Sequence, residues 1–454
     1  MYRILIFGTG QYYQKRKEKV LNDEVIGFLD NDENKQHKIL EGRYIYSPDE
    51  IRELEFDYVL LMSKSSISMK QQLLDMGVKE ESIIDYACYY KIKPFTEIKV
   101  FCSDNQNEIV EQEKLVLLIS HELSNTGAPI VLYYMAKLLH KNGYYPVIIS
   151  GTEGVLQKTI LYDRIPLIIS ENVNNFLIKM LLRKAIMTIC NTLETGYLVE
   201  DCACLCKKVV WWLHEGEASY REMTMAYCKK NFMPNVRILA VSELTKKTFC
   251  KYTLEDRNIK VFPYGIPDKG NKRKKIGNKI KFFLAGTISK RKGQDIMVEA
   301  IQLLTNEELE RSEFIFAGAI WEKDVYEKIQ RCTLSQVSYK GQLTISEMQE
   351  LYEDIDIVVC PSREDPLPVV LTEGMMNAKA CIMSDNTGMA LLIKDKKQGI
   401  ICKAGNVDSL VEQIRWVIHN TDKVEDIMKN GRKFYEENFT MRAFERRILD
   451  IFDE

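Results

Sequence analysis

The chain has 454 residues, of which 46% are hydrophobic and 28% are charged, and its formal net charge is −2. This length is enough for two or three domains of ~100–200 residues each. The balanced charge does not indicate nucleic-acid binding. No stretch reaches the ~18 apolar residues of a membrane-spanning helix.

The first residues, MYRILIFGTG, predict a short strand followed by glycines, and they do not resemble a secretory signal. A chain without such a signal keeps its thiols reduced. We therefore expect the twelve cysteines to be reduced and mostly buried, including the alternating set in DCACLC (201–206). Metal or redox use of this set is the alternative.

Strands and helices alternate from end to end, as is typical of parallel sheets with crossover helices. In the first hundred residues the pattern predicts strands over 3–8, 25–32 and 57–63 and helices over 11–22 and 67–76. Residues 87–113 lose this alternation and become polar, which predicts a linker and a first boundary near residue 100.

Two longer alternations follow, separated by the basic run 269–279. The first predicts a helix over 128–141 and strands over 114–120, 145–150, 185–191, 208–214, 237–242 and 258–265. The second predicts strands over 279–286, 313–318, 338–341, 354–362, 380–384 and 399–405. The fold class predicted is therefore α/β, with two doubly wound domains facing each other behind a smaller Rossmann-like α/β domain.

The basic run 269–279 is typical of a solvated linker. A patch for anionic lipid headgroups is the alternative. The expected location is cytoplasmic, with this run as the candidate for peripheral contact at the inner membrane face.

The stretch PSREDPLPVVLTEGM (361–375) holds two acids eight positions apart, Asp365 and Glu373. It follows the apolar strand 354–362, so it lies where open α/β sheets bind ligands. The helix predicted after Pro368 offers free amides to an anion, and carboxylates are good acceptors for sugar hydroxyls. Alternatively, Asp365 only caps the helix and Glu373 lies on its solvated face.

This stretch resembles the block of two glutamates with seven residues between them that is found in the retaining family 4 glycosyltransferases, which have the two-domain GT-B fold. Asp365 takes the place of the first glutamate, and Glu364 is one position out of register. The resemblance implies that Glu373 binds the ribose of a donor nucleotide and that Asp365 contacts the donor sugar or its phosphates. Pro366, Leu367 and Pro368 would form the donor-binding loop between them.

FLAGTISKRKGQDIMVEAI (283–301) resembles the family's strand, glycine, loop and Lys-Gly helix. Gly286 closes the strand, and the resemblance places Lys292 on the donor diphosphate, where a fixed cation would stabilise the leaving group. Thr287 stands where the family often has arginine, and Lys290 or Arg291 is a candidate replacement. A solvated loop is the alternative for KRKG.

Two segments of the first large domain resemble family blocks. In SHELSNTGAPI (120–130) the resemblance makes Gly127 a donor contact at a helix start. In WWLHEGEASY (211–220) His214 is a candidate contact to donor or acceptor at a strand end, with a structural role as the alternative, and Glu215 and Glu217 are candidate acceptor contacts.

The first domain carries Gly8 and Gly10 after its strand, but Tyr13 stands where the third glycine of a dinucleotide fingerprint would fall. Asp30 ends the second strand, in reach of a ribose hydroxyl. This part resembles small Rossmann-like domains fused before sugar-modifying enzymes. We expect a scaffold or interaction module, with nucleotide binding by Gly8, Gly10 and Asp30 as the alternative.

The predicted domains are 1–98, an accessory domain; 99–268, the acceptor-side GT-B domain; and 269–431, the donor domain. The helix 432–454 would cross back onto the acceptor-side domain. The resemblance implies transfer of a hexose or deoxyhexose from a nucleotide-diphosphate sugar, with retention. The acceptor would be a glycan, lipid-linked glycan or glycoprotein in polysaccharide or glycoconjugate assembly. We expect no metal, no cofactor and no nucleic-acid partner.

Two other functions stay open from the sequence. One is a non-catalytic glycosyltransferase-like partner subunit, whose cleft would lack the donor ligands. The other is a sugar-nucleotide oxidoreductase or epimerase that works through the first domain.

Overall fold

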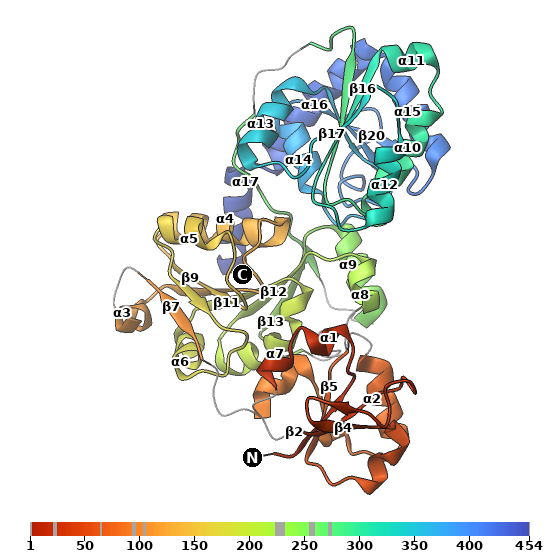
Figure 1. Cartoon of the computed structure of the whole chain (residues 1–454). Helices are drawn as coiled ribbons and strands as arrows, with labels where there is room; N and C mark the ends of the chain where they lie inside the picture. Colours follow the sequence, from red (N-terminus) through yellow and green to blue (C-terminus); the bar gives the residue numbers. More distant parts are fainter. Residues whose placement is uncertain are drawn as a thin grey trace.

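The computed structural model describes residues 2–20, 25–63, 66–92, 97–102, 106–222, 232–253, 259–270 and 275–453. These residues form three α/β units, each built on its own sheet (Figure 1). We name them the accessory domain (residues 2–92), the first lobe (97–270, joined by the last helix) and the second lobe (275–438). The α/β fold class predicted from the alternation is confirmed.

The accessory domain has a sheet in the order β3-β4-β2-β1-β5-β6. Its strands are β1 (Ile4–Phe7), β2 (Val25–Leu29), β3 (Ile39–Leu40), β4 (Arg43–Tyr46), β5 (Tyr58–Leu61) and β6 (Ile83–Asp85). Its helices are α1 (Gln11–Gln14), α2 (Ser66–Asp75) and the 3-10 helices η1 (Lys17–Lys19), η2 (Pro48–Glu53), η3 (Glu80–Ser82) and η4 (Tyr86–Ile92). The helix predicted over 11–22 is thus wrong in length: it consists of α1 and η1, and residues 21–24 lie outside the described residues.

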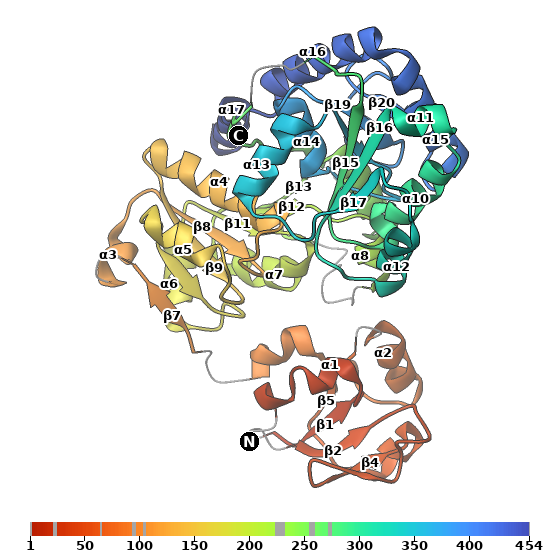
Figure 2. The same cartoon turned by 45° about the horizontal axis from the view of Figure 1, so that its top comes forward.

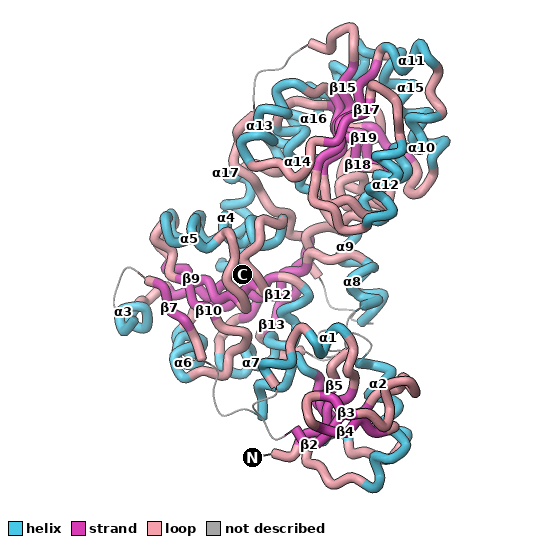
Figure 3. Tube along the Cα trace, viewed as in Figure 1, coloured by secondary structure: helices cyan, strands magenta, loops and turns pink. Residues whose placement is uncertain are grey.

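The first lobe has a sheet in the order β14-β13-β12-β11-β8-β9-β10-β7. Its strands are β7 (Lys99–Phe101), β8 (Leu115–Ser120), β9 (Tyr145–Ser150), β10 (Leu167–Ile169), β11 (Met187–Asn191), β12 (Val209–Leu213), β13 (Val236–Ala240) and β14 (Lys260–Val261). Its helices are α3 (Gln106–Glu111), α4 (Gly127–Lys141), α5 (Gln157–Tyr162), α6 (Phe176–Lys184), η5 (Leu193–Thr195), α7 (Gly196–Leu205), α8 (Glu217–Glu222) and α9 (Glu243–Thr253). Figure 3 shows these helices on both faces of the sheet.

The linker predicted over 87–113 is wrong in part. Within it, β7 pairs antiparallel with β10 as an edge strand, and Tyr90 and Ile109 are buried in the core of the first lobe. A three-residue edge strand is too short to produce a recognisable alternation, so local pattern could not reveal it.

The second lobe has a parallel sheet in the order β17-β16-β15-β18-β19-β20. Its strands are β15 (Ile280–Ala285), β16 (Ser312–Ala317), β17 (Val337–Tyr339), β18 (Ile357–Cys360), β19 (Ala380–Ser384) and β20 (Ile400–Cys402). Its helices are η6 (Lys290–Lys292), α10 (Gln294–Gln302), α11 (Asn306–Glu310), α12 (Lys323–Arg331), α13 (Ile345–Asp354), α14 (Val369–Met376), α15 (Val407–His419) and α16 (Thr421–Asn438). Part of the predicted basic linker, residues 271–274, lies outside the described residues.

The last helix, α17 (Met441–Asp453), returns to the first lobe beside α4 (Figure 1). Glu445 pairs with Lys141 at 3.0 Å, and the Phe452 ring lies 4.6 Å from that of Tyr144. The two lobes also share a hydrophobic cluster, in which Tyr264 of the first lobe packs with Leu371 of the second. Figure 2 shows the lobes side by side.

In each sheet the strand order reverses at one point. This point lies between β1 and β5 in the accessory domain, between β8 and β11 in the first lobe, and between β15 and β18 in the second lobe. Such switch points leave a crevice outside the carboxyl ends of the strands, where ligands bind in open α/β sheets. The fold therefore offers three positions for sites, one in each unit.

Within the described parts of the chain, none of the helices combines the length and the hydropathy that crossing a bilayer requires. The cysteines of these parts are free thiols, and in the DCACLC cluster Cys202 and Cys206 are buried whereas Cys204 is exposed.

Candidate active site

At the switch point of the second lobe, the loop after β15 meets the loop after β18. Gly286 and Gly293 bound the first loop and both have positive φ, +146° and +77°. A Cβ on Gly293 would lie 2.4 Å from the carbonyl oxygen of Pro361. Glycine is needed there because any side chain would push the two loops apart.

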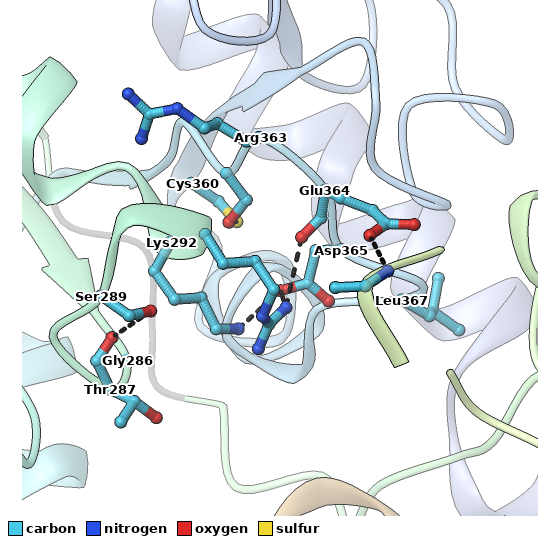
Figure 4. A network of polar contacts seen from close by, with 12 residues as sticks. Gly286, Thr287, Ser289, Lys292, Cys360, Arg363, Glu364, Asp365 and Leu367 are labelled. Atoms are coloured by element: carbon cyan, nitrogen blue, oxygen red, sulfur yellow. Dashed lines mark hydrogen bonds and ion pairs between the residues drawn. The ribbon is translucent and has the colours of Figure 1, made fainter. Parts of the chain in front are cut away.

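Lys292 and Asp365 form the centre of this site (Figure 4). The Lys292 Nζ lies 2.6 Å from Asp365 Oδ2, and Arg291 is 3.8 Å from the same oxygen. Asp365 is only 5% exposed. A buried carboxylate needs such a partner, because desolvating an unpaired charge is costly. The cation and the acid predicted to bind a donor are thus adjacent and neutralise each other in this structure.

Glu373 lies in the second turn of α14, partly buried, and Tyr352 of α13 donates a hydrogen bond of 2.9 Å to its Oε2. Burial raises the pKa of Glu373 to about 6, although the Tyr352 hydrogen bond and the Lys269 charge act in the opposite direction. The charges of both Glu373 and Asp365 raise the pKa of Tyr264, after the larger effect of burial. The two acids therefore act on one region of the site.

Gln294 was missed by the sequence analysis. Its side chain is fully buried, its Nε2 donates to the carbonyl oxygens of Gly286 (3.3 Å) and Thr287 (3.0 Å), and its Oε1 accepts from the Ser289 amide (3.2 Å). Gln294 thus fixes the loop that carries Lys292. Only its place directly after the Lys-Gly pair could have pointed to it, because a single glutamine carries no periodic signal.

Arg363 joins the two loops from the other side. It makes a two-pronged ion pair with Asp295, with nitrogen–oxygen distances of 2.9 and 2.8 Å, and its amide donates to the Arg291 carbonyl oxygen at 2.8 Å. Such bidentate pairs fix geometry as well as charge. The positions of Arg291 and Lys292 are therefore held by a neighbouring loop.

The acid next to Asp365 has a different role. Glu364 extends to the first lobe, where its carboxylate accepts hydrogen bonds from the amides of Glu217 and Ala218, the second at 3.2 Å. A Cβ on Gly216 would lie 2.5 Å from Glu364 Oε1. Two neighbouring acids thus have different partners: Asp365 pairs with Lys292, and Glu364 binds the facing lobe.

Other contacts also join the lobes at this edge. A Cβ on Gly127, at the start of α4, would lie 3.2 Å from Val369, the first residue of α14. The Tyr264 hydroxyl donates to the Leu367 carbonyl oxygen at 3.1 Å. The predicted donor loop Pro366, Leu367 and Pro368 is therefore held against the first lobe, with Pro368 as the N-cap of α14.

His214 follows β12 and packs against Trp212, with ring centroids 4.3 Å apart and the two rings tilted by 58°. Its Nε2 is buried and has no hydrogen-bond partner among the described residues. Burial, helped by the charge of His121, lowers the pKa of His214 to about 3. The histidine is therefore neutral near pH 7, and a neutral ring nitrogen without a partner can still bond to a ligand.

Glu215 lies beside His214 and accepts a hydrogen bond of 2.9 Å from the His214 amide. Burial raises the pKa of Glu215 to about 7 from an ordinary value of 4.5. Glu217, by contrast, is paired with Lys251 at 2.9 Å and accepts from Tyr252 at 3.0 Å, so it is engaged by α9.

Because the folded state holds the Glu215 proton more tightly than the unfolded state, stability should fall as pH rises from 4.5 to 7. We expect Glu215→Gln to match the wild type at pH 4.5 and to be more stable above pH 7. The difference should be on the order of 2 kcal/mol, since some solvent contact reduces the full effect. Melting temperatures of the two proteins across this range test this. A difference that is constant with pH would contradict it.

The accessory domain has its own cavity of about 550 Å³ at the carboxyl ends of β1, β2 and β5, lined by Gly8, Gly10 and Asp30 among others. Gly8 has φ +101°, and a Cβ there would lie 2.9 Å from the Met62 carbonyl oxygen. The Asp30 carboxylate accepts from the amide (3.0 Å) and hydroxyl of Thr9. Burial raises the pKa of Asp30, but the hydrogen bonds to Thr9, Asp32 and Lys35 outweigh it and lower the pKa. Nucleotide binding here stays a prediction.

Among the residues that the structure describes, no group of three or more His, Cys, Asp or Glu side chains is arranged to hold a metal ion. The candidate donor-site residues of the second lobe lie in its two facing loops and in helix α14: Gly286, Arg291, Lys292, Asp365 and Glu373. The candidates of the first lobe lie at the carboxyl edge of its sheet: Gly127 and His214.

The two facing doubly wound lobes have the GT-B fold. Solved structures of this fold align well. HepE of Anabaena in complex with UDP and glucose has a TM-score of 0.63 and 16% identity, covering 75% of this chain and 99% of that one. A glycosyltransferase of Rickettsia africae has a TM-score of 0.59 and 18% identity, covering 75% and 98%.

The chain belongs to the family 4 glycosyltransferases. Residues 112–266 match the model described as glycosyl-transferase family 4, and residues 266–434 match that of glycosyl transferases group 1. Residues 1–84 match a separate model, C2185-like, N-terminal. The family predicted from the motifs is therefore confirmed.

Curated relatives are distant. An uncharacterised glycosyltransferase of Methanocaldococcus jannaschii, MJ1607, is 23% identical over 48% of this chain and 59% of its own length. A second from the same organism, MJ1178, is 26% identical over 37% of this chain and 46% of its own length. The chain thus spans about half the length of these relatives. In Campylobacter jejuni, N,N'-diacetylbacillosaminyl-diphospho-undecaprenol alpha-1,3-N-acetylgalactosaminyltransferase is 25% identical over 32% of this chain and 38% of its own.

Proposed function

We propose that this chain transfers a hexose or deoxyhexose from a nucleotide-diphosphate sugar to a glycan acceptor, with retention of anomeric configuration and without a metal. The acceptor would be a glycan, lipid-linked glycan or glycoprotein in polysaccharide or glycoconjugate assembly. The observation that carries the proposal is the ion pair of Lys292 and Asp365 at the switch point of the second lobe, with Glu373 in the following helix α14, which starts against the first lobe.

The relatives support the choice of substrates. HepE has been crystallised with UDP and glucose and with UDP-glucose, and the Campylobacter enzyme is named for an undecaprenol-diphosphate-linked sugar acceptor. We extend to this chain the use of a nucleotide-diphosphate donor and a glycan acceptor.

The residues suit distinct tasks in such a transfer. Lys292 would bind the donor diphosphate, together with the free amides at the start of α14. Glu373 would accept hydrogen bonds from the ribose hydroxyls, and Asp365 would contact the donor sugar once the diphosphate shares its lysine. A lysine that is already held in a fixed, partly buried position costs no reorganisation when the leaving group gains charge.

The proposed chemistry takes place on one face of the sugar. The bond from the anomeric carbon to the diphosphate oxygen breaks, and the acceptor oxygen bonds to the same carbon on the same face. The acceptor proton passes to the departing phosphate oxygen, so no side chain has to act as nucleophile. Contact between the lobes through Glu364 would exclude water from the donor.

Glu373→Gln tests the donor site. The carboxamide still accepts from Tyr352 but loses the charge that holds the ribose hydroxyls, and hydrogen bonds to charged groups are worth ~1.5–3 kcal/mol. We therefore expect the KM for the donor to rise about 10- to 100-fold. The measurement is transfer from a panel of nucleotide sugars, beginning with UDP-glucose.

Glu350→Gln is the matched control, since Glu350 is an exposed acid on the neighbouring helix α13. An unchanged donor KM in Glu373→Gln would remove Glu373 from the site. The absence of transfer from every donor in the wild type would favour a non-catalytic partner subunit.

A further inference from the structure

A cavity of about 700 Å³ lies between the accessory domain and the first lobe. On the lobe side, its wall comes from the carboxyl edge of the sheet, with His121 after β8, Gly151 after β9 and Glu194 after β11. On the other side, Tyr12 of α1 and Tyr86 of η4 line it. The cavity therefore lies at the switch point of the first lobe, where a ligand of this sheet is expected.

The accessory domain is anchored beside this cavity. Tyr90 of η4 is buried in the core of the first lobe, and its hydroxyl donates to Asp201. Lys91 pairs with Asp201 at 3.2 Å, and Lys19 forms an ion pair with Glu171. Both walls are therefore held in place, and the cavity is a built feature of the chain.

Tyrosine rings form much of the wall. The rings of Tyr12 and Tyr86 meet edge to face at 6.0 Å, and Tyr197 of α7 completes the group from the lobe side. Arg16 lies 3.9 Å above the Tyr12 ring. A tyrosine offers an apolar face and a polar edge. That combination fits a sugar ring, which has an apolar C–H face and a rim of hydroxyls.

The charges in the cavity balance one another. Lys19 is paired with Glu171, Lys99 is paired with Glu153 at 2.5 Å, and the exposed acid Glu194 faces them from η5. A diphosphate would meet carboxylates as well as cations here. A neutral ligand with many hydroxyls matches this lining better, because carboxylates and charged nitrogens both bond to hydroxyls.

One loop of the first lobe runs from this cavity to the contact between the two lobes. His121 lines the cavity and begins the loop that leads to Gly127, which in turn meets Val369 of the second lobe. A chain of sugars that follows this loop from the contact between the lobes would reach the cavity at His121.

We propose that this cavity binds neutral sugar residues of the acceptor glycan that lie beyond the residue receiving the transferred sugar. The accessory domain then contributes half of an extended acceptor site. This inference rests on the proposed function, because it assigns the cavity to the acceptor of that reaction.

Tyr12→Ala tests the proposal in the full chain. Two measurements are made on this variant. One is binding to an array of immobilised neutral oligosaccharides, and the other is the KM for long and for single-sugar acceptors. We expect at least a tenfold loss of array binding and a tenfold rise in KM for the long acceptor only, with an unchanged donor KM. Tyr12→Phe, which keeps the ring, should bind like the wild type. Glu194→Ala, at an exposed position, is the second variant and should show the same selective loss.

Tyr162→Ala is the matched control, because Tyr162 is 87% exposed on α5 and does not line the cavity. If the wild type binds array glycans and Tyr12→Ala does not, the result supports the proposal even when the wild type transfers no sugar. The absence of transfer would refute only the proposed function. A wild type that transfers sugar but binds no array glycan, or equal losses on long and short acceptors, would overturn the cavity's role.

Discussion

Lys292→Gln is expected to lower kcat for sugar transfer by ~10²–10³, the usual effect of removing one group that stabilises developing negative charge. The lysine is the cation fixed nearest to Asp365 at the switch point, with its Nζ 2.6 Å from that acid. Steady-state transfer with a saturating donor measures the loss. Lys323→Gln is the control, since Lys323 is exposed on α12 of the same lobe.

The same variant leaves Asp365 buried, and among the described residues Arg291, at 3.8 Å, is then its remaining cationic partner. Removing one partner of a buried pair typically costs ~3–5 kcal/mol, and Arg291 should reduce that cost. The double variant Lys292→Gln/Asp365→Asn removes both charges and should recover most of the lost melting temperature. Its transfer activity should stay low. Recovery of activity together with stability would mean that Lys292 only neutralises Asp365.

Gly388→Ala is expected to destabilise the donor loop by ~3 kcal/mol, at the upper end for added volume in a packed site. A Cβ on Gly388 would lie 1.7 Å from the Pro366 carbonyl oxygen and 2.6 Å from the Ser242 hydroxyl of the first lobe. Because the first of these atoms is backbone, the loop itself has to move. The Gly388 amide also donates to the Asp365 carbonyl oxygen at 2.9 Å, so the shift should reach the acid that pairs with Lys292.

Thermal melting and the donor KM measure this effect together, and we expect the first to fall and the second to rise at least tenfold. Gly277→Ala is the control, because Gly277 is exposed and a Cβ there has no neighbour closer than 4.0 Å. Surface substitutions of that kind usually stay within about 0.5 kcal/mol. Equal behaviour of the two variants would show that the tight contact at Gly388 does not hold the donor loop.

The sequence by itself determined the central strands of each sheet and which loops follow them. Apolar runs bounded by glycines and acids, such as 279–286 and 354–362, mark buried parallel strands, and the side chains that follow them must lie at the carboxyl edge. That reasoning predicted Asp365 and Glu373 at one edge, because it depends only on local order along the chain, and the family resemblance added Lys292.

Only the tertiary structure decided which partners these residues meet. The separate roles of Glu364 and Asp365, the buried Gln294 beneath the loop and the tyrosine-lined cavity all depend on contacts between segments far apart in the chain. The edge strand β7 and the burial of Tyr90 also depend on contacts between distant segments. Periodicity reports which face of an element is buried but not what lies against it, so these contacts follow from the packing of whole domains.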